Sequence, residues 1–204
     1  HYLATLRDAG AQFVVMEVSS HGLCQHRIDA VRFIGAVFTN LSRDHLDYHG
    51  SMEEYEKAKA KLFSVPSLQF AVINKDDLVA NSMTSAVPAG AHILSYSVAE
   101  HTADISVLSD ELNENGIDAL VKASVGQIRI NSPLLGRFNL SNLLAVVGVA
   151  IAFDDTSNLE ARLTKIRPVD GRMEVIRGPE SPVVVVDYAH TPDALKNVLE
   201  TLRA

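Results

Sequence analysis

Two runs of polar residues hold most of the side chains that could do chemistry. The run at residues 17–23, EVSSHGL, carries a carboxylate, serines and a histidine, and the run at residues 40–50, NLSRDHLDYHG, carries aspartates and histidines. Each run begins where a short apolar segment ends. Ligands of open α/β sheets bind outside the carboxyl ends of the strands, where loop residues can reach a phosphate or a metal. The two runs therefore predict one shared site.

The segment after the second run predicts a helix with a lysine on its apolar face. Ser51, followed three residues later by Glu54, forms a capping box that marks the start of this helix. At about 100° per residue, Lys59 falls on the same stripe as Tyr55, and the other lysines of the helix fall outside it. Such a lysine either lays its stem on the core and extends its ammonium to solvent, or has a lowered pKa and reacts with carbon dioxide to form a carbamate.

The same residues suggest a magnesium site. Mg²⁺ prefers oxygen ligands and keeps waters or substrate phosphates in its shell. A carbamate on Lys59 is a carboxylate on a long arm, and beside His45 and Glu17 it could help to hold the ion. Residue type alone leaves a structural alternative open, because polar loops also carry such residues for caps and turns.

Alternating strands and helices position these runs. Strands are predicted at residues 13–17, 34–38, 70–73 and 183–186, and helices at residues 2–9, 52–65, 139–153 and 159–166. Continuous apolar strands that alternate with helices indicate an α/β fold, with a mostly parallel sheet flanked by helices. Between residues 93 and 130 the segments become short and alternating, which predicts a small antiparallel subsheet.

The chain is predicted to contain a central domain, residues 1–177, and the start of a second domain. Residues 178–182, GPESP, have the composition of an interdomain linker. Beyond them, Thr191, Pro192 and Asp193 supply the cap, the proline and the acid that open a helix. Because the sequence begins in a helical pattern without an initiator methionine, we expect an excised fragment.

Composition excludes several classes of function. A net charge of −7 argues against a general electrostatic hold on nucleic acid, so an anionic ligand must be held locally. No apolar run approaches the ~20 residues that span a bilayer. The single cysteine, Cys24, excludes an intramolecular disulfide and fits a reducing compartment. We expect a cytoplasmic protein with neither a nucleic-acid partner nor a membrane insertion.

Six motifs along almost the whole chain resemble the Mur ligases, in the order that this family has. They are EVSSHGL at residues 17–23, NLSRDHLD at 40–47, YEKAK at 55–59, GRFNLSN at 136–142, GRME at 171–174 and DYAHTP at 187–192. The Ser-Ser-His-Gly version of the first motif is similar to the members that add the third amino acid of the peptidoglycan stem peptide.

The resemblance implies a P-loop-type central domain and the first strand and helix of a Rossmann-like C-terminal domain. It implies an ATP-dependent amide-bond ligase of peptidoglycan precursor synthesis, which adds meso-diaminopimelate or lysine to UDP-N-acetylmuramoyl-L-alanyl-D-glutamate through an acyl phosphate. The expected cofactor is Mg²⁺, with ATP as co-substrate. The expected partners are the UDP-N-acetylmuramoyl-dipeptide, ATP and a diamino acid, and the expected state is a monomer.

The resemblance also assigns the metal and catalytic residues. Glu17 would bind the Mg²⁺ shared with the β- and γ-phosphates of ATP, while His45 and carbamylated Lys59 would hold a second Mg²⁺. Arg172 would reach the γ-phosphate and complete the catalytic set with Lys59 and His45. On residue type alone, Arg172 is equally a surface cation.

Binding residues follow from the same resemblance. Ser19, Gln25 and Arg27 would contact the UDP-muramoyl-dipeptide, and an arginine suits this task because its fork pairs with a carboxylate or phosphate at two points. Asn142 would contact the adenine and Asp187 the ribose. Without the resemblance, Asn142 is a helix-start residue and Asp187 a turn acid.

The chain departs from the family pattern in three ways. It lacks the Gly-Lys-Thr phosphate loop that precedes this region in relatives, and it lacks most of the C-terminal domain that selects the amino acid. Phe138 stands where several Mur ligases carry histidine, so we assign it no catalytic role. The fragment alone is expected to be inactive.

Three other hypotheses remain open. A ligase such as folylpolyglutamate synthase would share the ATP and metal residues but not the dipeptide-binding ones. A metal-dependent hydrolase built on His45, Asp47 and His49 would bind a transition metal without nucleotide. A noncatalytic interaction domain would bind neither metal nor UDP-sugar.

Overall fold

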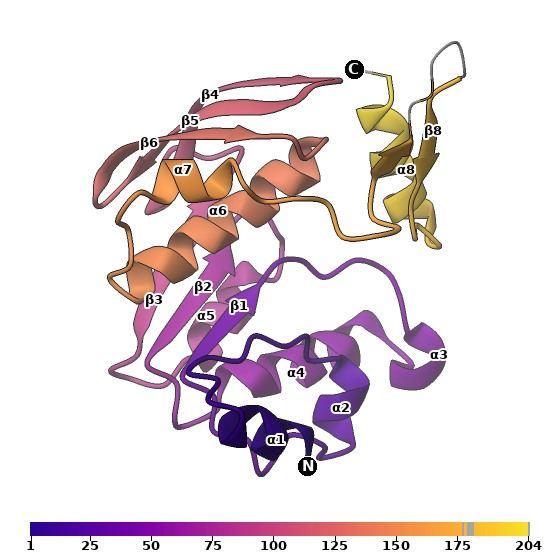
Figure 1. Cartoon of the computed structure of the whole chain (residues 1–204). Helices are drawn as coiled ribbons and strands as arrows, with labels where there is room; N and C mark the ends of the chain where they lie inside the picture. The colour runs from indigo at the N-terminus through magenta and orange to yellow at the C-terminus, as the bar shows by residue number, and fades with distance from the viewer. Residues whose placement is uncertain (177, 179–181, 204) are drawn as a thin grey trace.

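The computed structural model describes residues 1–176, 178 and 182–203. Its centre is a six-stranded sheet in the order β1-β2-β3-β4-β5-β6 (Figure 1). The strands are β1 (Gly35–Phe38), β2 (Phe70–Asn74), β3 (His92–Ser97), β4 (Ile105–Asn113), β5 (Gly116–Ala123) and β6 (Gly126–Ser132). Strands β1 to β4 run parallel, and β5 and β6 continue the sheet in antiparallel pairing. The predicted α/β fold with a mostly parallel sheet is confirmed.

The antiparallel part begins later in the chain than the sequence pattern indicates. Strand β3 lies inside the predicted antiparallel region, yet it pairs with β2 in parallel. The antiparallel pairs are β4 with β5 and β5 with β6, and they are continuous with the parallel strands.

Gly116, at the turn between β4 and β5, has a φ of +139°, and a Cβ there would collide with the Ser132 carbonyl. This turn therefore requires glycine.

Helices cover both faces of the sheet. They are α1 (Tyr2–Asp8), α2 (Ser20–Cys24), α3 (Leu46–His49), α4 (Met52–Phe63), α5 (Ala80–Ala86), α6 (Arg137–Ala152), α7 (Leu159–Leu163) and α8 (Pro192–Thr201). On one face Phe70 and Val72 of β2 join a core cluster with α6, and on the other Ala71 and Ile73 join a cluster with α4 and α5. Strand β2 is thus buried on both sides, as its uninterrupted apolar sequence predicts.

Capping residues set the first residues of two helices, α4 and α8. The Ser51 hydroxyl accepts the Glu54 N–H at 3.2 Å and opens α4, which positions Lys59. The Thr191 hydroxyl accepts the Ala194 N–H at 3.2 Å and opens α8. The predicted helices are confirmed, and their ends differ from the predicted ones by a few residues.

The predicted strand at residues 13–17 is wrong. This segment joins no strand ladder among the described residues, and β1 is an outer strand of the sheet. An apolar sequence favours a strand, but a strand also needs a neighbouring strand that forms hydrogen bonds with its N–H and C=O groups. The Phe13 ring packs edge-on against Phe153, with 5.2 Å between ring centroids, while Val15 is 96% exposed.

The C-terminal residues form a small unit beside the main sheet (Figure 1). Strands β7 (Glu174–Ile176) and β8 (Val184–Val186) pair antiparallel, and α8 follows. Residues 179–181 of the predicted linker lie outside the described residues. A Cβ on Gly136 would stand 2.9 Å from Thr201 Cγ2, so the end of α8 touches the start of α6. The domain boundary after residue 177 stays a prediction.

No described helix combines the length and the apolar character needed to cross a bilayer.

Candidate active site

Lys59 is the inward-facing lysine of α4, as the helical spacing predicts. Lys57 is exposed and forms an ion pair with Glu53 at 2.8 Å, whereas Lys59 is half-buried. The Lys59 ammonium lies 5.2 Å from the centroid of the Tyr55 ring. Tyr55 is itself buried, so the side chain of Lys59 runs along the core rather than into solvent.

The negative charges of three carboxylates act on the Lys59 amine. Burial lowers the pKa of Lys59, and the nearby charges of Glu17, Asp77 and Asp44 act in the opposite direction without cancelling the effect of burial. These acids come from three separate places: Glu17 precedes α2, Asp44 follows β1 and Asp77 follows β2. Glu17 and Lys59 are therefore near enough for their charges to interact, and their joint role at a metal stays a prediction.

His45 is held beside this group by an unusual backbone conformation. It has a φ of +55°, in the left-handed region, where a residue with a side chain is uncommon. The Asp44 carboxylate accepts the His45 N–H at 2.7 Å and so supports that conformation. The His45 ring meets the rings of His21 and Tyr55 edge-on, with centroid distances of 4.9 and 5.9 Å. Its position is thus fixed from several sides.

Asp77 is a site residue that the sequence analysis missed. One carboxylate oxygen accepts the Leu41 N–H at 2.7 Å and the other accepts the Val79 N–H at 3.0 Å. Through its bond to Leu41, Asp77 stabilises the loop that leads from β1 to His45. The signal was present in the sequence, because Asp77 closely follows a buried apolar strand, where site residues of parallel sheets lie.

The loop histidines do not form a metal site of their own. His49 makes a hydrogen bond with Ser20, 2.9 Å between Nε2 and Oγ, and its ring stacks on Tyr55. Burial lowers the pKa of His49, and the neighbouring His21 and His45 lower it further. Within the described part of the chain, no three His, Cys, Asp or Glu side chains are arranged to hold a metal ion. The hydrolase hypothesis gains no support from this geometry.

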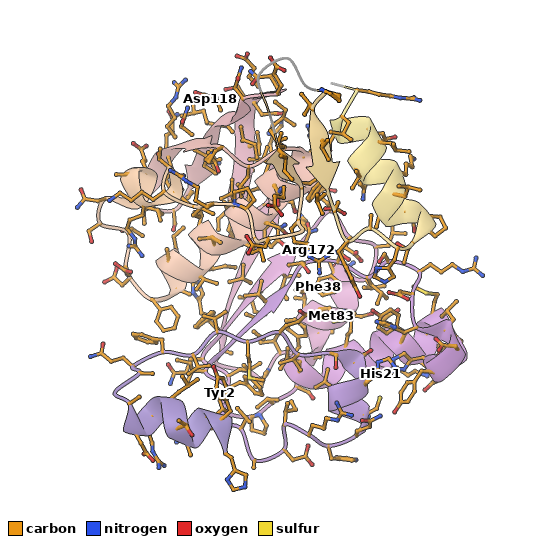
Figure 2. The ribbon with its side chains drawn as sticks, turned by 45° about the vertical axis from the view of Figure 1, so that its right-hand side comes forward. Tyr2, His21, Phe38, Met83, Asp118 and Arg172 are labelled. Carbon is orange, nitrogen blue, oxygen red and sulfur yellow. The ribbon has the colours of Figure 1, made fainter. Side chains whose placement is uncertain are left out.

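The predicted dipeptide-binding residues flank α2, with Ser19 as its N-cap, Gln25 as its C-cap and Arg27 just beyond. The Ser19 hydroxyl caps α2 and accepts the Gly22 N–H at 3.1 Å. The Gln25 amide donates to the Tyr48 hydroxyl at 3.5 Å, and the Arg27 side chain is exposed. Helix α2 packs against α4, and His21, labelled in Figure 2, lies on α2. The three residues therefore flank a helix that packs on the helix carrying Lys59.

The predicted nucleotide residues lie on two elements. The Asp187 carboxylate accepts the Met173 N–H at 2.9 Å and the Ala189 N–H at 2.7 Å, which ties the loop after β8 to the turn before β7. That turn also carries Arg172, whose guanidinium carbon lies 4.9 Å from the centroid of the Tyr188 ring. In Figure 2, Arg172 is drawn just above the end of β1. Arg172 and Asp187 thus belong to one cluster.

Asn142 stands on the other element, exposed near the start of α6. Its amide donates to the Asn139 side chain at 3.3 Å. The neighbouring Ser141 makes a hydrogen bond with the Tyr96 hydroxyl, which also donates to the Phe38 carbonyl at 3.2 Å. The start of α6 is thereby fixed to the carboxyl end of β1.

Residues 1–150 match the family described as Mur ligase middle domain, and residues 171–204 match the family described as Mur ligase, glutamate ligase domain. The chain belongs to the Mur ligase family. It is 50% identical, over 98% of its length, to a UDP-N-acetylmuramoyl-L-alanyl-D-glutamate–2,6-diaminopimelate ligase of Xylella fastidiosa strain Temecula1, and 48% identical to the Pseudomonas aeruginosa PAO1 protein of the same name. The chain spans 41% of the length of these curated relatives.

Solved Mur ligase structures share the fold. A UDP-N-acetylmuramoyl-L-alanyl-D-glutamate–2,6-diaminopimelate ligase matches 96% of this chain with a TM-score of 0.84 and 44% identity, and the match covers 41% of that structure. MurF from Acinetobacter baumannii matches 85% of this chain and 38% of its own, with a TM-score of 0.76. At 20% identity, the second likeness shows the fold alone.

Proposed function

We propose that this Mur ligase chain carries the metal and phosphate-transfer residues of an enzyme that adds meso-diaminopimelate to UDP-N-acetylmuramoyl-L-alanyl-D-glutamate. The observation that carries the proposal is the half-buried Lys59 amine, which lies over the Tyr55 ring that His45 also meets, and on which the charges of Glu17, Asp44 and Asp77 act. Relatives that are 50% identical are named as ligases of this kind. We therefore expect phosphoryl transfer to take place at the carboxyl ends of β1 and β2.

The donor set suits Mg²⁺ if Lys59 is carbamylated. A carbamate would replace the positive charge of Lys59 by a negative one in a region where the charges of Glu17, Asp44 and Asp77 already act, and it would supply the oxygen ligands that a divalent cation prefers. Glu17 would hold one Mg²⁺, and His45 with the Lys59 carbamate would hold another. When bound, the ions neutralise charge on the phosphates and the carboxylate.

The proposed reaction has two steps. A carboxylate oxygen of the glutamyl residue attacks the γ-phosphorus of ATP, the bond to the bridging oxygen breaks, and ADP leaves with an acyl phosphate formed. The amine nitrogen then attacks the acyl carbon, loses a proton and expels inorganic phosphate as the amide forms. Arg172 is the proposed partner of the transferring phosphoryl group, since a guanidinium fork matches phosphate oxygens.

Ser19, Gln25 and Arg27 are the proposed contacts to the UDP-muramoyl-dipeptide. They flank α2, which packs against the helix that carries Lys59, and this packing supports the assignment. Asn142 is the proposed contact to the adenine and Asp187 to the ribose, each with a polar side chain on an element near the carboxyl end of β1. We also propose that the protein is a monomer and that it is cytoplasmic. The free thiol of Cys24 supports the cytoplasmic location, because free thiols persist in a reducing compartment.

The test uses the product of the complete open reading frame that contains these 204 residues, referred to below as the complete gene product. ADP release is followed with Mg²⁺ and either UDP-N-acetylmuramoyl-L-alanyl-D-glutamate plus an amine, or a folate plus glutamate. Turnover is expected with the UDP-sugar peptide plus the amine and not with the folate plus glutamate. Turnover with the folate alone would replace the proposal by a folylpolyglutamate-type ligase, whose Lactobacillus casei representative shares the fold at 20% identity.

A further inference from the structure

A histidine outside the assigned site residues joins the two parts of the site. His190 lies in the loop between β8 and α8, and Asp44 lies in the loop that follows β1. His190 Nε2 stands 3.6 Å from one carboxylate oxygen of Asp44. The contact connects the small C-terminal unit to the loop of the main sheet that carries His45. None of the roles described above uses this contact.

The other oxygen of Asp44 acts on His45. Asp44 Oδ1 accepts the backbone N–H of His45 at 2.7 Å and lies 3.5 Å from His45 Nδ1. His45 is the residue with left-handed backbone in this loop, and that conformation depends on local support. A group that orients the Asp44 carboxylate therefore also influences the position of the His45 ring.

On its other side, His190 contacts Tyr188, which in turn contacts Arg172. His190 Nδ1 donates to the Tyr188 carbonyl at 2.9 Å, and the two rings meet edge-on with 5.1 Å between centroids. The Arg172 guanidinium lies over the face of the same Tyr188 ring. With Nδ1 occupied in this way, Nε2 is the atom of His190 that faces Asp44.

We propose that His190 is a positioning residue that sets the distance between His45 and Arg172. It acts through a continuous series of contacts: His45, Asp44, His190, Tyr188 and Arg172. The inference rests on the proposed function, in which His45 serves the metal and Arg172 serves the transferring phosphoryl group. These two groups come from separate sheets, so their relative placement needs a connection of this kind. Misplacing reacting groups by about 1 Å costs roughly 100-fold in rate.

The first test is the steady-state kinetics of His190→Ala in the complete gene product. His101→Ala is the matched control, because His101 is an exposed histidine in the turn between β3 and β4. We expect kcat to fall roughly 10- to 100-fold, the range found when outer partners of metal ligands are removed, with the KM for the UDP-sugar peptide little changed. Equal kcat in the two variants would overturn the inference.

A double-mutant cycle then tests whether His190 acts through Asp44. Asp44→Asn keeps an acceptor for the His45 N–H and removes the charge that faces His190. The double variant is expected to be no slower than the slower single variant, because both changes interrupt one series of contacts. Multiplicative losses of kcat would contradict the inference. If His190→Ala does not fold, the cycle is run with His190→Phe, which keeps a ring beside Tyr188 and has no polar atom to face the Asp44 carboxylate.

A readout without turnover separates this inference from the proposed function. In ligand-free, ¹⁵N-labelled protein, the His45 backbone amide resonance is expected to shift in His190→Ala and to stay in place in His101→Ala. An unmoved His45 resonance would overturn the inference, whatever the activity. Absence of ligase turnover in the unaltered protein would instead remove the proposed function and leave this structural coupling measurable.

Discussion

The Lys59 ammonium lies over the ring of Tyr55, one helical turn away on the same face of α4, at 5.2 Å from the ring centroid. Burial, and to a smaller extent Asp44, raises the pKa of Tyr55, so the phenol stays neutral and its ring face is available to the cation. Burial meanwhile lowers the pKa of Lys59. The pair holds the Lys59 amine in a defined position rather than in solvent.

Replacing Lys59 by alanine should abolish most of the ligase activity. In the complete gene product we expect kcat to fall roughly 100-fold or more, the loss typical of removing one charge-stabilising group, with nucleotide affinity changed only modestly. Lys57→Ala is the control, because Lys57 is exposed and its ion pairs are with Glu53 and Glu54 of its own helix. Near-normal turnover of Lys59→Ala would exclude a catalytic role for this lysine.

Carbamylation of Lys59 should depend on pH in a defined direction. Only the neutral amine attacks carbon dioxide, so the carbamate should increase as the pH rises through the pKa of the lysine. Burial lowers the pKa of Lys59, which moves this rise to lower pH than for an ordinary lysine. ¹³C NMR with ¹³C-labelled carbon dioxide measures it: a carbamate signal present in Lys57→Ala and lost in Lys59→Ala is expected. The same signal in both variants would assign it to another amine.

Arg27 should contribute to binding and not to the chemical step. We expect Arg27→Ala to raise the KM for the UDP-sugar peptide roughly 10-fold, since a charge-assisted contact contributes about 1.5 kcal/mol, while kcat stays near the unaltered value. The exposed Arg32 supplies the control variant, Arg32→Ala. If the KM of Arg27→Ala equals that of the control, Arg27 lies outside the substrate site.

Gly148 should be required for the close packing of α6 on the sheet. A Cβ at this position would stand 2.6 Å from Val72 Cγ1, on a strand that is completely buried. Overpacking costs about 1–3 kcal/mol, and the better helix propensity of alanine returns about 1 kcal/mol. We therefore expect Gly148→Ala to lower the free energy of unfolding by about 1 kcal/mol.

Urea unfolding of the 204-residue chain measures this effect. Val146→Ala, on the exposed side of the same helix, should change the free energy of unfolding by less than about 0.5 kcal/mol. A Gly148→Ala variant that is as stable as the unaltered chain would show that Val72 yields to the added methyl group.

Features set by local sequence could be predicted, and the inward direction of Lys59 is the clearest example. The Ser51 cap fixes where α4 begins, and the helical repeat then fixes which face each residue takes. The same holds for the Thr191 cap of α8 and for the helical patterns. These features depend on neighbours within a few residues, which the sequence displays directly.

Features set by distant contacts could not be predicted in the same way. Asp77 and His190 gain their places from loops that the fold brings together, and nothing next to them in the sequence indicates those partners. Residues 13–17 have strand composition, but no described strand takes up their hydrogen bonds. Strand β3 is parallel because of the partner it meets, which an alternating pattern does not specify.

The central claim is that this chain belongs to an amine-dependent ligase of the UDP-muramoyl-dipeptide. The most direct measurement is ADP release by the complete gene product with UDP-N-acetylmuramoyl-L-alanyl-D-glutamate, ATP and Mg²⁺, with meso-diaminopimelate, lysine or no amine. The account predicts turnover that requires meso-diaminopimelate, with one amide formed per ADP. Turnover without an amine, or no turnover with either amine in a folded, magnesium-supplied protein, would contradict it.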